Sequence, residues 1–258
     1  MKSADVKEIY DGDYFLKAVD GCKEFSEFDG TFNSLFPRYQ RNIQLLDLQP
    51  QHKLLEIGCG RGEVCIFHAL RGGSAKGVDY SADAISLARE KATVLGAKAE
   101  FMESSFDGLE EPAATYDRIL ASEFIEHISA EEGLKFFQAA FSMLKPDGKL
   151  LVFTMPNTLQ RRYGYPIQRL WALLHGKRLP KQPAETTSEH FWNFHLNEQN
   201  YFSLRKFAHQ AGFRRFMVGY DVQYAPTPSK VKRFIRCLIK LPPLCHIMLS
   251  NLFLVAQK

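Results

Sequence analysis

Short apolar runs alternate along the chain with longer stretches in which apolar residues recur every three or four positions. The short runs predict buried strands at 53–57, 75–78, 99–102, 116–121, 149–154, 214–224 and 250–256. The longer stretches predict helices at 32–48, 61–71, 81–95, 129–144 and 197–211. Strands that alternate with helices predict an α/β fold, with a mostly parallel sheet and helices on both of its faces.

Polar residues and glycine at the ends of the predicted helices support these boundaries. Ser81 precedes one helix and Gly96 follows it, which is typical of an N-cap and a C-cap. Ser129 and Glu132 have the spacing of a capping box. The sequence Lys-Pro-Asp-Gly at 145–148 predicts a turn immediately before the fifth strand.

Three glycines at alternate positions, Gly58, Gly60 and Gly62, follow the first apolar strand. Glycines allow positive φ and let a ligand approach the peptide units closely. The dinucleotide-binding fingerprint requires its third glycine one residue later, where this chain has Glu63. A carboxylate there would repel a pyrophosphate. The loop therefore favours a ligand with a ribose and an amino-acid tail, and it counts against a nucleotide-dependent oxidoreductase.

The stretch from Leu54 to Val64 resembles the first motif of class I S-adenosylmethionine (SAM)-dependent methyltransferases, of the type 11/12-like group. The resemblance extends from about Arg38 to Gly212, and the Lys-Pro-Asp-Gly turn is a further hallmark. It implies a Rossmann-like sheet of seven strands, six parallel and the last antiparallel. SAM would lie at the carboxyl ends of the first, second and fourth strands.

An acid about 20 residues after the glycine loop, Asp79, is placed to accept hydrogen bonds from a ribose diol, a feature that NAD enzymes share. Ser105 stands where the family usually has an acid for the adenine amino group, and Phe106 is expected on the adenine or in the core. Arg38 and Tyr39 are expected at the SAM carboxylate, or alternatively as a surface arginine and a core tyrosine. The cofactor-binding residues that the resemblance implies are Glu56, Gly58, Cys59, Gly60, Gly62, Asp79, Tyr80, Ser105, Phe106, Ser122, Arg38 and Tyr39.

A second cluster, Glu123, Glu126 and His127, has i, i+3, i+4 spacing, which would place the three side chains on one face of a helix. We favour His127 as a general base, because imidazole titrates near neutral pH, with His195 and Glu123 as further catalytic residues. The motif is similar to that of ubiquinone-pathway O-methyltransferases and of small-RNA 2′-O-methyltransferases, both associated with a divalent metal. The alternative is thus a divalent ion held by Glu123, Glu126, His127 and His195, with His190 as a second choice for the last ligand. We favour a site without metal.

The composition limits the class of protein. The 258 residues fit one α/β domain, and the net charge of +4 is too mild to indicate nucleic acid on its own. Five cysteines without a C-x-x-C pair argue against a disulfide framework and a thiolate zinc site, and favour a reducing cytosol. The first eight residues lack the apolar core of a signal peptide, and no stretch is apolar enough to span a bilayer. We therefore expect a cytoplasmic protein, with membrane association left open.

Residues 1–32 are expected to form an N-terminal helical cap, and 33–258 the methyltransferase domain with two insertions. The first insertion, 155–195, is rich in arginine and aromatic residues, includes a short helix within 166–175, and is expected to cover the substrate. The second, 225–249, replaces a tight hairpin and mixes basic with apolar residues. We favour a helix packed on its own domain there. The alternative is peripheral contact with an anionic membrane through 229–249.

The favoured function is methyl transfer from SAM to a small-molecule acceptor, at a hydroxyl of a sugar, a phenol or quinone, or a natural product. The basic insertions favour an anionic or amphiphilic acceptor. One alternative is a metal-dependent RNA 2′-O-methyltransferase, although the mild charge makes nucleic acid an unexpected partner. Another is a SAM-binding partner subunit without catalysis.

Overall fold

The computed structural model describes residues 12, 14–18, 20–181, 195–222 and 228–258. One sheet has the strand order β3-β2-β1-β4-β5-β7-β6. The strands are β1 (Lys53–Ile57), β2 (Ser74–Asp79), β3 (Glu100–Glu103), β4 (Tyr116–Ser122), β5 (Leu144–Thr154), β6 (Arg215–Tyr220) and β7 (Leu252–Gln257). The strands β1 to β5 are parallel, and β7 pairs antiparallel with both β5 and β6. The predicted seven-stranded sheet with an antiparallel last strand is therefore confirmed.

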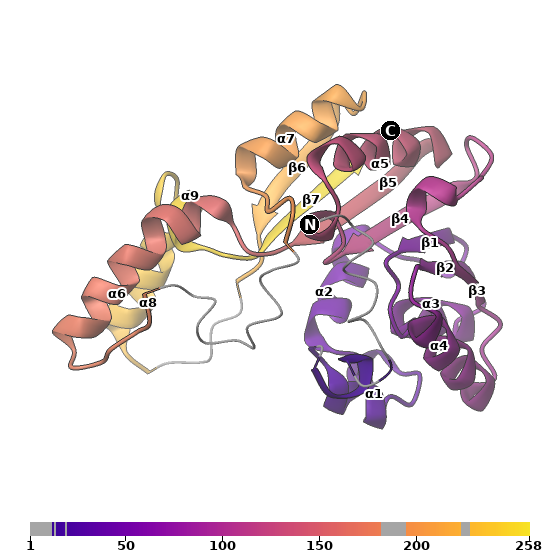
Figure 1. Ribbon diagram of the computed structural model, residues 1–258, viewed down its shortest axis with the longest axis horizontal. Helices are drawn as coiled ribbons and strands as arrows, with labels where there is room; N and C mark the ends of the chain where they lie inside the picture. Colours follow the sequence, from indigo (N-terminus) through magenta and orange to yellow (C-terminus); the bar gives the residue numbers. More distant parts are fainter. Residues whose placement is uncertain (1–11, 13, 19, 182–194, 223–227) are drawn as a thin grey trace.

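Helices cover both faces of this sheet (Figure 1). On one face lie α2 (Pro37–Leu46), α3 (Glu63–Leu70) and α4 (Ala82–Leu95), and on the other lie α5 (Ala130–Met143) and α7 (Tyr201–Gln210). Neighbouring strand residues point to opposite faces, so Leu54 packs in the first helical layer and Leu55 in the second. Each central strand is consequently buried on both sides.

Local capping fixes the two long helices as the sequence predicts. The Ser81 hydroxyl accepts a hydrogen bond from Ala84 N, and Gly96 ends α4 in the left-handed conformation. Ser129 and Glu132 form a reciprocal capping box at the start of α5. Such side chains satisfy backbone N–H groups that have no partner within the helix.

Several predicted boundaries are wrong. The helix predicted at 32–48 is split into η3 (Phe32–Ser34) and α2, because the residue before Pro37 avoids the helical conformation. The last crossover helix begins at Tyr201, after its cap Asn200 and four residues later than predicted. The predicted turn at 145–148 lies within β5, which starts at Leu144 and has a register irregularity against β4.

The N-terminal region and the two insertions form short helices. The N-terminal region contains η2 (Tyr14–Ala18) and α1 (Cys22–Glu27). The first insertion forms η6 (Gln160–Gly164) and α6 (Tyr165–Leu174), and the second forms α8 (Lys230–Ile239) and α9 (Leu244–Met248). In Figure 1, α6, α8 and α9 all appear at the left of the view, apart from the helices that cover the sheet. None of the helices in the described ranges has the length and apolar character needed to cross a membrane.

Gly62 shows how tightly the turn after β1 is packed. It begins α3 with φ of 76°, and a Cβ there would lie 2.5 Å from Cε1 of Phe101 and 3.0 Å from Cβ of Ala88. A side chain at this position would therefore meet both backbone strain and steric overlap.

We predict that Gly62→Ala lowers the free energy of unfolding by about 3 kcal/mol, from strain at positive φ and overpacking against Phe101. The measurement is urea unfolding followed by circular dichroism. Gly72→Ala is the matched control, because Gly72 has φ of 86° but no atom within 4 Å of the added Cβ. It should cost only about 1 kcal/mol. Equal losses in the two variants would contradict the packing argument.

Candidate functional site

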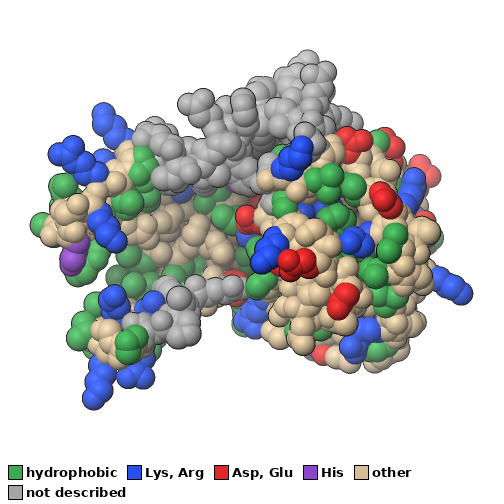
Figure 2. All heavy atoms as spheres, turned by 90° about the horizontal axis from the view of Figure 1, so that it is seen from below, with side chains coloured by type: hydrophobic (Ala, Val, Ile, Leu, Met, Phe, Trp, Pro, Cys, Tyr) green, Lys and Arg blue, Asp and Glu red, His purple; other side chains and the backbone are tan. Residues whose placement is uncertain are grey.

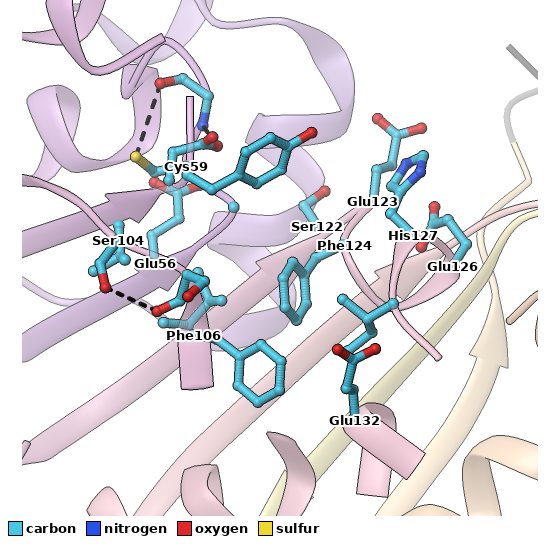
Figure 3. Close-up of a pocket in the computed structure, with 18 of the residues that line it drawn as sticks. Glu56, Cys59, Ser104, Phe106, Ser122, Glu123, Phe124, Glu126, His127 and Glu132 are labelled. Carbon is cyan, nitrogen blue, oxygen red and sulfur yellow. Dashed lines mark hydrogen bonds between the residues drawn. The ribbon is translucent and has the colours of Figure 1, made fainter. Parts of the chain in front are cut away.

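A cavity of about 300 Å³ opens at the carboxyl ends of the parallel strands, where the strand order reverses between β1 and β4. Its walls come from the loops that follow β1 to β5 and from residues of the N-terminal region. In open α/β sheets ligands bind at such a reversal. Figure 3 shows Glu56, Ser104 and Phe106 at one end, and Glu123, Glu126 and His127 at the other.

The glycine loop is shaped by hydrogen bonds to the end of β2. Gly58 and Gly60 have φ of 69° and 51°, and Gly58 N donates to Val78 O at 2.8 Å. Gly60 N donates to Asp79 Oδ2 at 2.9 Å, and Ser81 N donates to Asp79 Oδ1 at 3.0 Å. Because a carboxylate has about four acceptor positions, Asp79 keeps acceptor capacity for a ligand in the cavity that it lines.

Glu56 lies buried at the end of β1, beside this loop. Burial raises its pKa to about 8, while a hydrogen bond donated by Cys65 Sγ at 3.2 Å opposes the rise. Its carboxyl group is therefore mostly protonated at pH 7, so that it can donate as well as accept a hydrogen bond. Cys59 and Tyr80, two further residues that the family resemblance implies, also line the cavity.

An aromatic wall follows β3. The ring of Phe106, in η4 (Phe106–Gly108), packs edge-on against Phe124 at 5.7 Å and Phe136 at 6.1 Å between centroids. Phe106 thus belongs to the core and also lines the cavity, so both sequence interpretations describe part of its position. Ser105 lines the cavity as well, together with Asp107, an acid two residues beyond the position where the sequence led us to expect one.

Two cofactor residues implied by the sequence do not line the cavity: Gly62, which packs on Phe101, and Arg38. The buried guanidinium of Arg38 forms ion pairs with Glu123 and, at 3.0 Å, with Asp20, which do line it. A ligand carboxylate would have to compete with Glu123 and Asp20 for the Arg38 guanidinium. Tyr39 is one of the lining residues, as is Ser122, whose hydroxyl accepts a hydrogen bond from Asn42 at 3.0 Å.

At the opposite end, the expected helical alignment of Glu123, Glu126 and His127 is not found. The last two belong to a single 3₁₀ turn, η5 (Ile125–His127), and Glu123 has φ of 54°. Glu123 is engaged by Arg38, whereas the buried Glu126 accepts a hydrogen bond from the Thr154 hydroxyl at 2.9 Å. Burial and the nearby Glu123 raise the pKa of Glu126 to about 8.

His127 and His195, 68 positions apart in the sequence, do come together as the sequence analysis proposed. Their rings lie 5.0 Å apart between centroids, nearly perpendicular, and both line the cavity. The backbone brings them there, because Leu196 N and Asn197 N donate to Glu126 O at 2.8 and 3.1 Å. Glu198 Oε1 lies 3.4 Å from His195 Nδ1. His190 lies outside the described residues.

The described part of the chain contains no group of three or more histidines, cysteines or acids arranged to hold a metal ion. Glu123 and Glu126 are directed to Arg38 and Thr154 instead. The arrangement gives no support to the divalent-ion interpretation among these residues.

The sequence analysis missed the N-terminal wall of the cavity. Tyr14, Phe15 and Asp20 line it, although no motif marks them. They are held by Arg61, only 2% exposed, which donates to Phe15 O at 2.9 Å and Asp20 O at 3.1 Å. Arg61 also pairs with Glu63 at 2.9 Å. The opposite charges of Arg61 and Glu63 at the glycine loop were the available signal. A buried charge needs partners, and the N-terminal region supplies further ones to Arg61.

Comparisons with known proteins agree with this geometry. Residues 54–148 match the methyltransferase domain family. The chain is 33% identical over 108 residues to a ubiquinone biosynthesis O-methyltransferase of Chelativorans, and 34% identical over 111 residues to phosphoethanolamine N-methyltransferase 3 of Arabidopsis thaliana. These segments cover 42% and 43% of this chain, and 42% and 22% of the relatives, so the chain spans less than half of each relative's length.

A solved structure shares nearly the whole fold. The magnesium protoporphyrin IX methyltransferase of Synechocystis, determined with bound S-adenosylhomocysteine (SAH), aligns with a TM-score of 0.55 at 16% identity, covering 99% of both chains. The sheet order, the glycine loop at the strand reversal and the matched domain lead to one conclusion. The fold is that of the class I SAM-dependent methyltransferases, and residues 54–148 match a methyltransferase domain.

Proposed function

We propose that this chain transfers a methyl group from SAM to a hydroxyl group of a small-molecule acceptor. The observation that carries the proposal is the pair of histidines at the end of the cavity opposite the aromatic wall. One end of the cavity then suits the adenosine part of the cofactor, and the other end offers imidazole nitrogens to an acceptor.

The residues present fit the cofactor. The open backbone of the glycine loop would face its amino-acid tail, and the remaining acceptor positions of Asp79 would face the ribose hydroxyls. Phe106 offers a ring edge and Asp107 an acceptor near the expected adenine position. When bound, SAM supplies a methyl group activated by a sulfonium. The protein must then position the acceptor and remove its proton.

We assign the role of general base to His127, which lines the cavity beside His195. A neutral imidazole nitrogen accepts the hydroxyl proton as the acceptor oxygen forms its bond to the methyl carbon and the carbon–sulfur bond breaks. His195, beside it, would orient the same hydroxyl, and Glu198 would act as a positioning residue through its contact with His195. Glu126, with its raised pKa, places little negative charge next to the imidazole at neutral pH.

Hydroxyl rather than amine acceptors are favoured by the same cluster. A hydroxyl keeps its proton at neutral pH and gains from a base, whereas a deprotonated amine is already nucleophilic. The ubiquinone-pathway relative is named as an O-methyltransferase and the plant relative as an N-methyltransferase, so similarity alone does not select the acceptor atom.

We predict that Asp79→Asn weakens SAH binding by about 10- to 100-fold, because a charged acceptor for the ribose hydroxyls is lost. Isothermal titration calorimetry of the purified full chain gives the affinity. Asp117→Asn is the matched control. Asp117 accepts a hydrogen bond from Lys53 N at 2.8 Å and lies near the start of β4, at the end of the strands away from the cavity. The control should retain its affinity. Absence of SAH binding by the unaltered chain would refute the proposed function.

We predict that His127→Gln lowers the methyl-transfer rate about 10²- to 10⁴-fold and leaves SAH affinity within about twofold. The assay follows labelled methyl from SAM onto a panel of phenols and glycosides. His175→Gln is the control, because His175 is exposed at the end of α6 and does not line the cavity.

The pH profile separates a base from a merely structural histidine. The unaltered chain should lose activity in acid as the base becomes protonated, and His127→Gln should lack that acid limb. An equal loss of rate at every pH, with the acid limb kept, would argue against the assigned role. SAH binding without transfer to any acceptor would instead favour a non-catalytic partner subunit.

A further inference from the structure

Two insertion helices present their apolar faces outward. In α8, Val231, Phe234, Ile235 and Leu238 follow the i, i+3, i+4, i+7 spacing of one helix face, and they are 67%, 64%, 39% and 39% exposed. The expectation that this helix packs its apolar face on its own domain is therefore wrong, since no residue of α8 is buried. A face of this kind needs a partner outside the described fold.

The helix α6 repeats the arrangement. Ile167, Leu170, Trp171 and Leu174 have the same spacing, and each is between 49% and 73% exposed. Only Ala172 of this helix is buried. The two helices thus expose two apolar stripes, which come from insertions more than 50 residues apart in the sequence.

Charge is segregated on the same two segments. Residues 159–181 contain six arginines and lysines, residues 228–249 contain five, and neither segment contains an aspartate or glutamate. Together they carry a formal +11, whereas the whole chain carries +4, so the remaining residues carry −7. Figure 2 shows basic and hydrophobic side chains mixed over the two projections at the left, whereas the acidic side chains in view lie over the rest of the molecule.

Close contacts with backbone carbonyls hold the two insertions together near the end of β5. The buried side chain of Asn157 donates to His246 O and to Leu249 O, each at 2.8 Å. Gly164 lies so close to the carbonyl of Ile247 that no Cβ could be accommodated. The two helices are therefore displayed by a fixed base next to Met155, which lines the cavity.

We infer that α6 and α8 form a docking surface for the headgroup region of an anionic membrane. Amphipathic helices with basic polar faces bind such surfaces by inserting apolar side chains and attracting acidic lipids. A second copy of this chain is disfavoured, because a symmetric contact would bring two surfaces of +11 together. Nucleic acid would satisfy the basic residues but leave the exposed side chains of Phe234, Leu170 and Leu174 in water.

The test is flotation of the full chain with vesicles of phosphatidylcholine alone, or of phosphatidylcholine with phosphatidylglycerol, at low and high salt. We expect binding to the anionic vesicles only, and weaker binding at high salt. Phe234→Ser with Leu170→Ser should lower the partition coefficient about tenfold, through lost apolar insertion. Lys232→Glu with Arg233→Glu should lower it at least tenfold.

Matched controls lie away from α6 and α8, on α1, on α4 and in the loop after α4. Val94→Ser removes an exposed apolar residue of α4, and Lys23→Glu with Lys98→Glu reverses two exposed charges, so neither should change binding.

Failure to bind anionic vesicles at low salt would overturn the inference. It would also be overturned if the two double variants of α6 and α8 bound as well as the unaltered chain. A dimer in light scattering that dissociates in the Phe234→Ser, Leu170→Ser variant would assign the surface to a second copy. Binding of RNA oligonucleotides that is lost only in the charge variant, without vesicle binding, would assign it to nucleic acid. SAH affinity should be unaltered in every variant, so this result is independent of the proposed function.

Discussion

The carboxylate of Asp79 ties together two of the loops that form the cavity. Its two oxygens accept hydrogen bonds from Gly60 N, in the loop after β1, and from Ser81 N, in the cap of α4. A single side chain thereby joins the turns that follow two neighbouring strands. Glycine tolerates the positive φ values of this loop because it has no Cβ, and the Asp79 carboxylate and Val78 O satisfy its N–H groups.

Acidic residues around the cavity are accommodated in two ways. Burial raises the pKa of Glu56 and of Glu126 to about 8, one at each end, so both are mostly neutral at pH 7. Glu123 instead has Arg38 beside it, and Glu63 has Arg61. The cavity therefore avoids an accumulation of unpaired negative charge that the fold would have to stabilise. It retains carboxyl groups that can form hydrogen bonds with a polar, cationic ligand.

Much of the fold was predictable, because local rules determine it. The alternation of apolar runs gave the strands, and the caps at Ser81 and Ser129 gave the helix starts to within a residue. The starts of α2 after Phe36 and of α7 after Asn200 were missed, because the apolar helical spacing extends upstream of both positions. The helices begin where Pro37 and the capping side chain of Asn200 set their first turns. In the candidate site, the loop residues and the two histidines were identified. The engagement of Arg38 by Glu123 and Asp20 was not, because it joins segments 18 and 85 positions apart without a motif.

Hydrogen bonds join the two ends of the first insertion. Thr158 N donates to Gln199 O at 2.9 Å, Asn200 Nδ2 donates to Thr158 Oγ1 at 3.0 Å, and Glu126 O holds the backbone next to His195. The chain therefore leaves the fold and returns to it at adjacent points. Residues between these points can be exchanged or lengthened at little cost in loop entropy, since that cost grows only slowly with length. The first insertion can then diverge as a replaceable module, while the histidine pair and the glycine loop at the other end of the cavity stay in place.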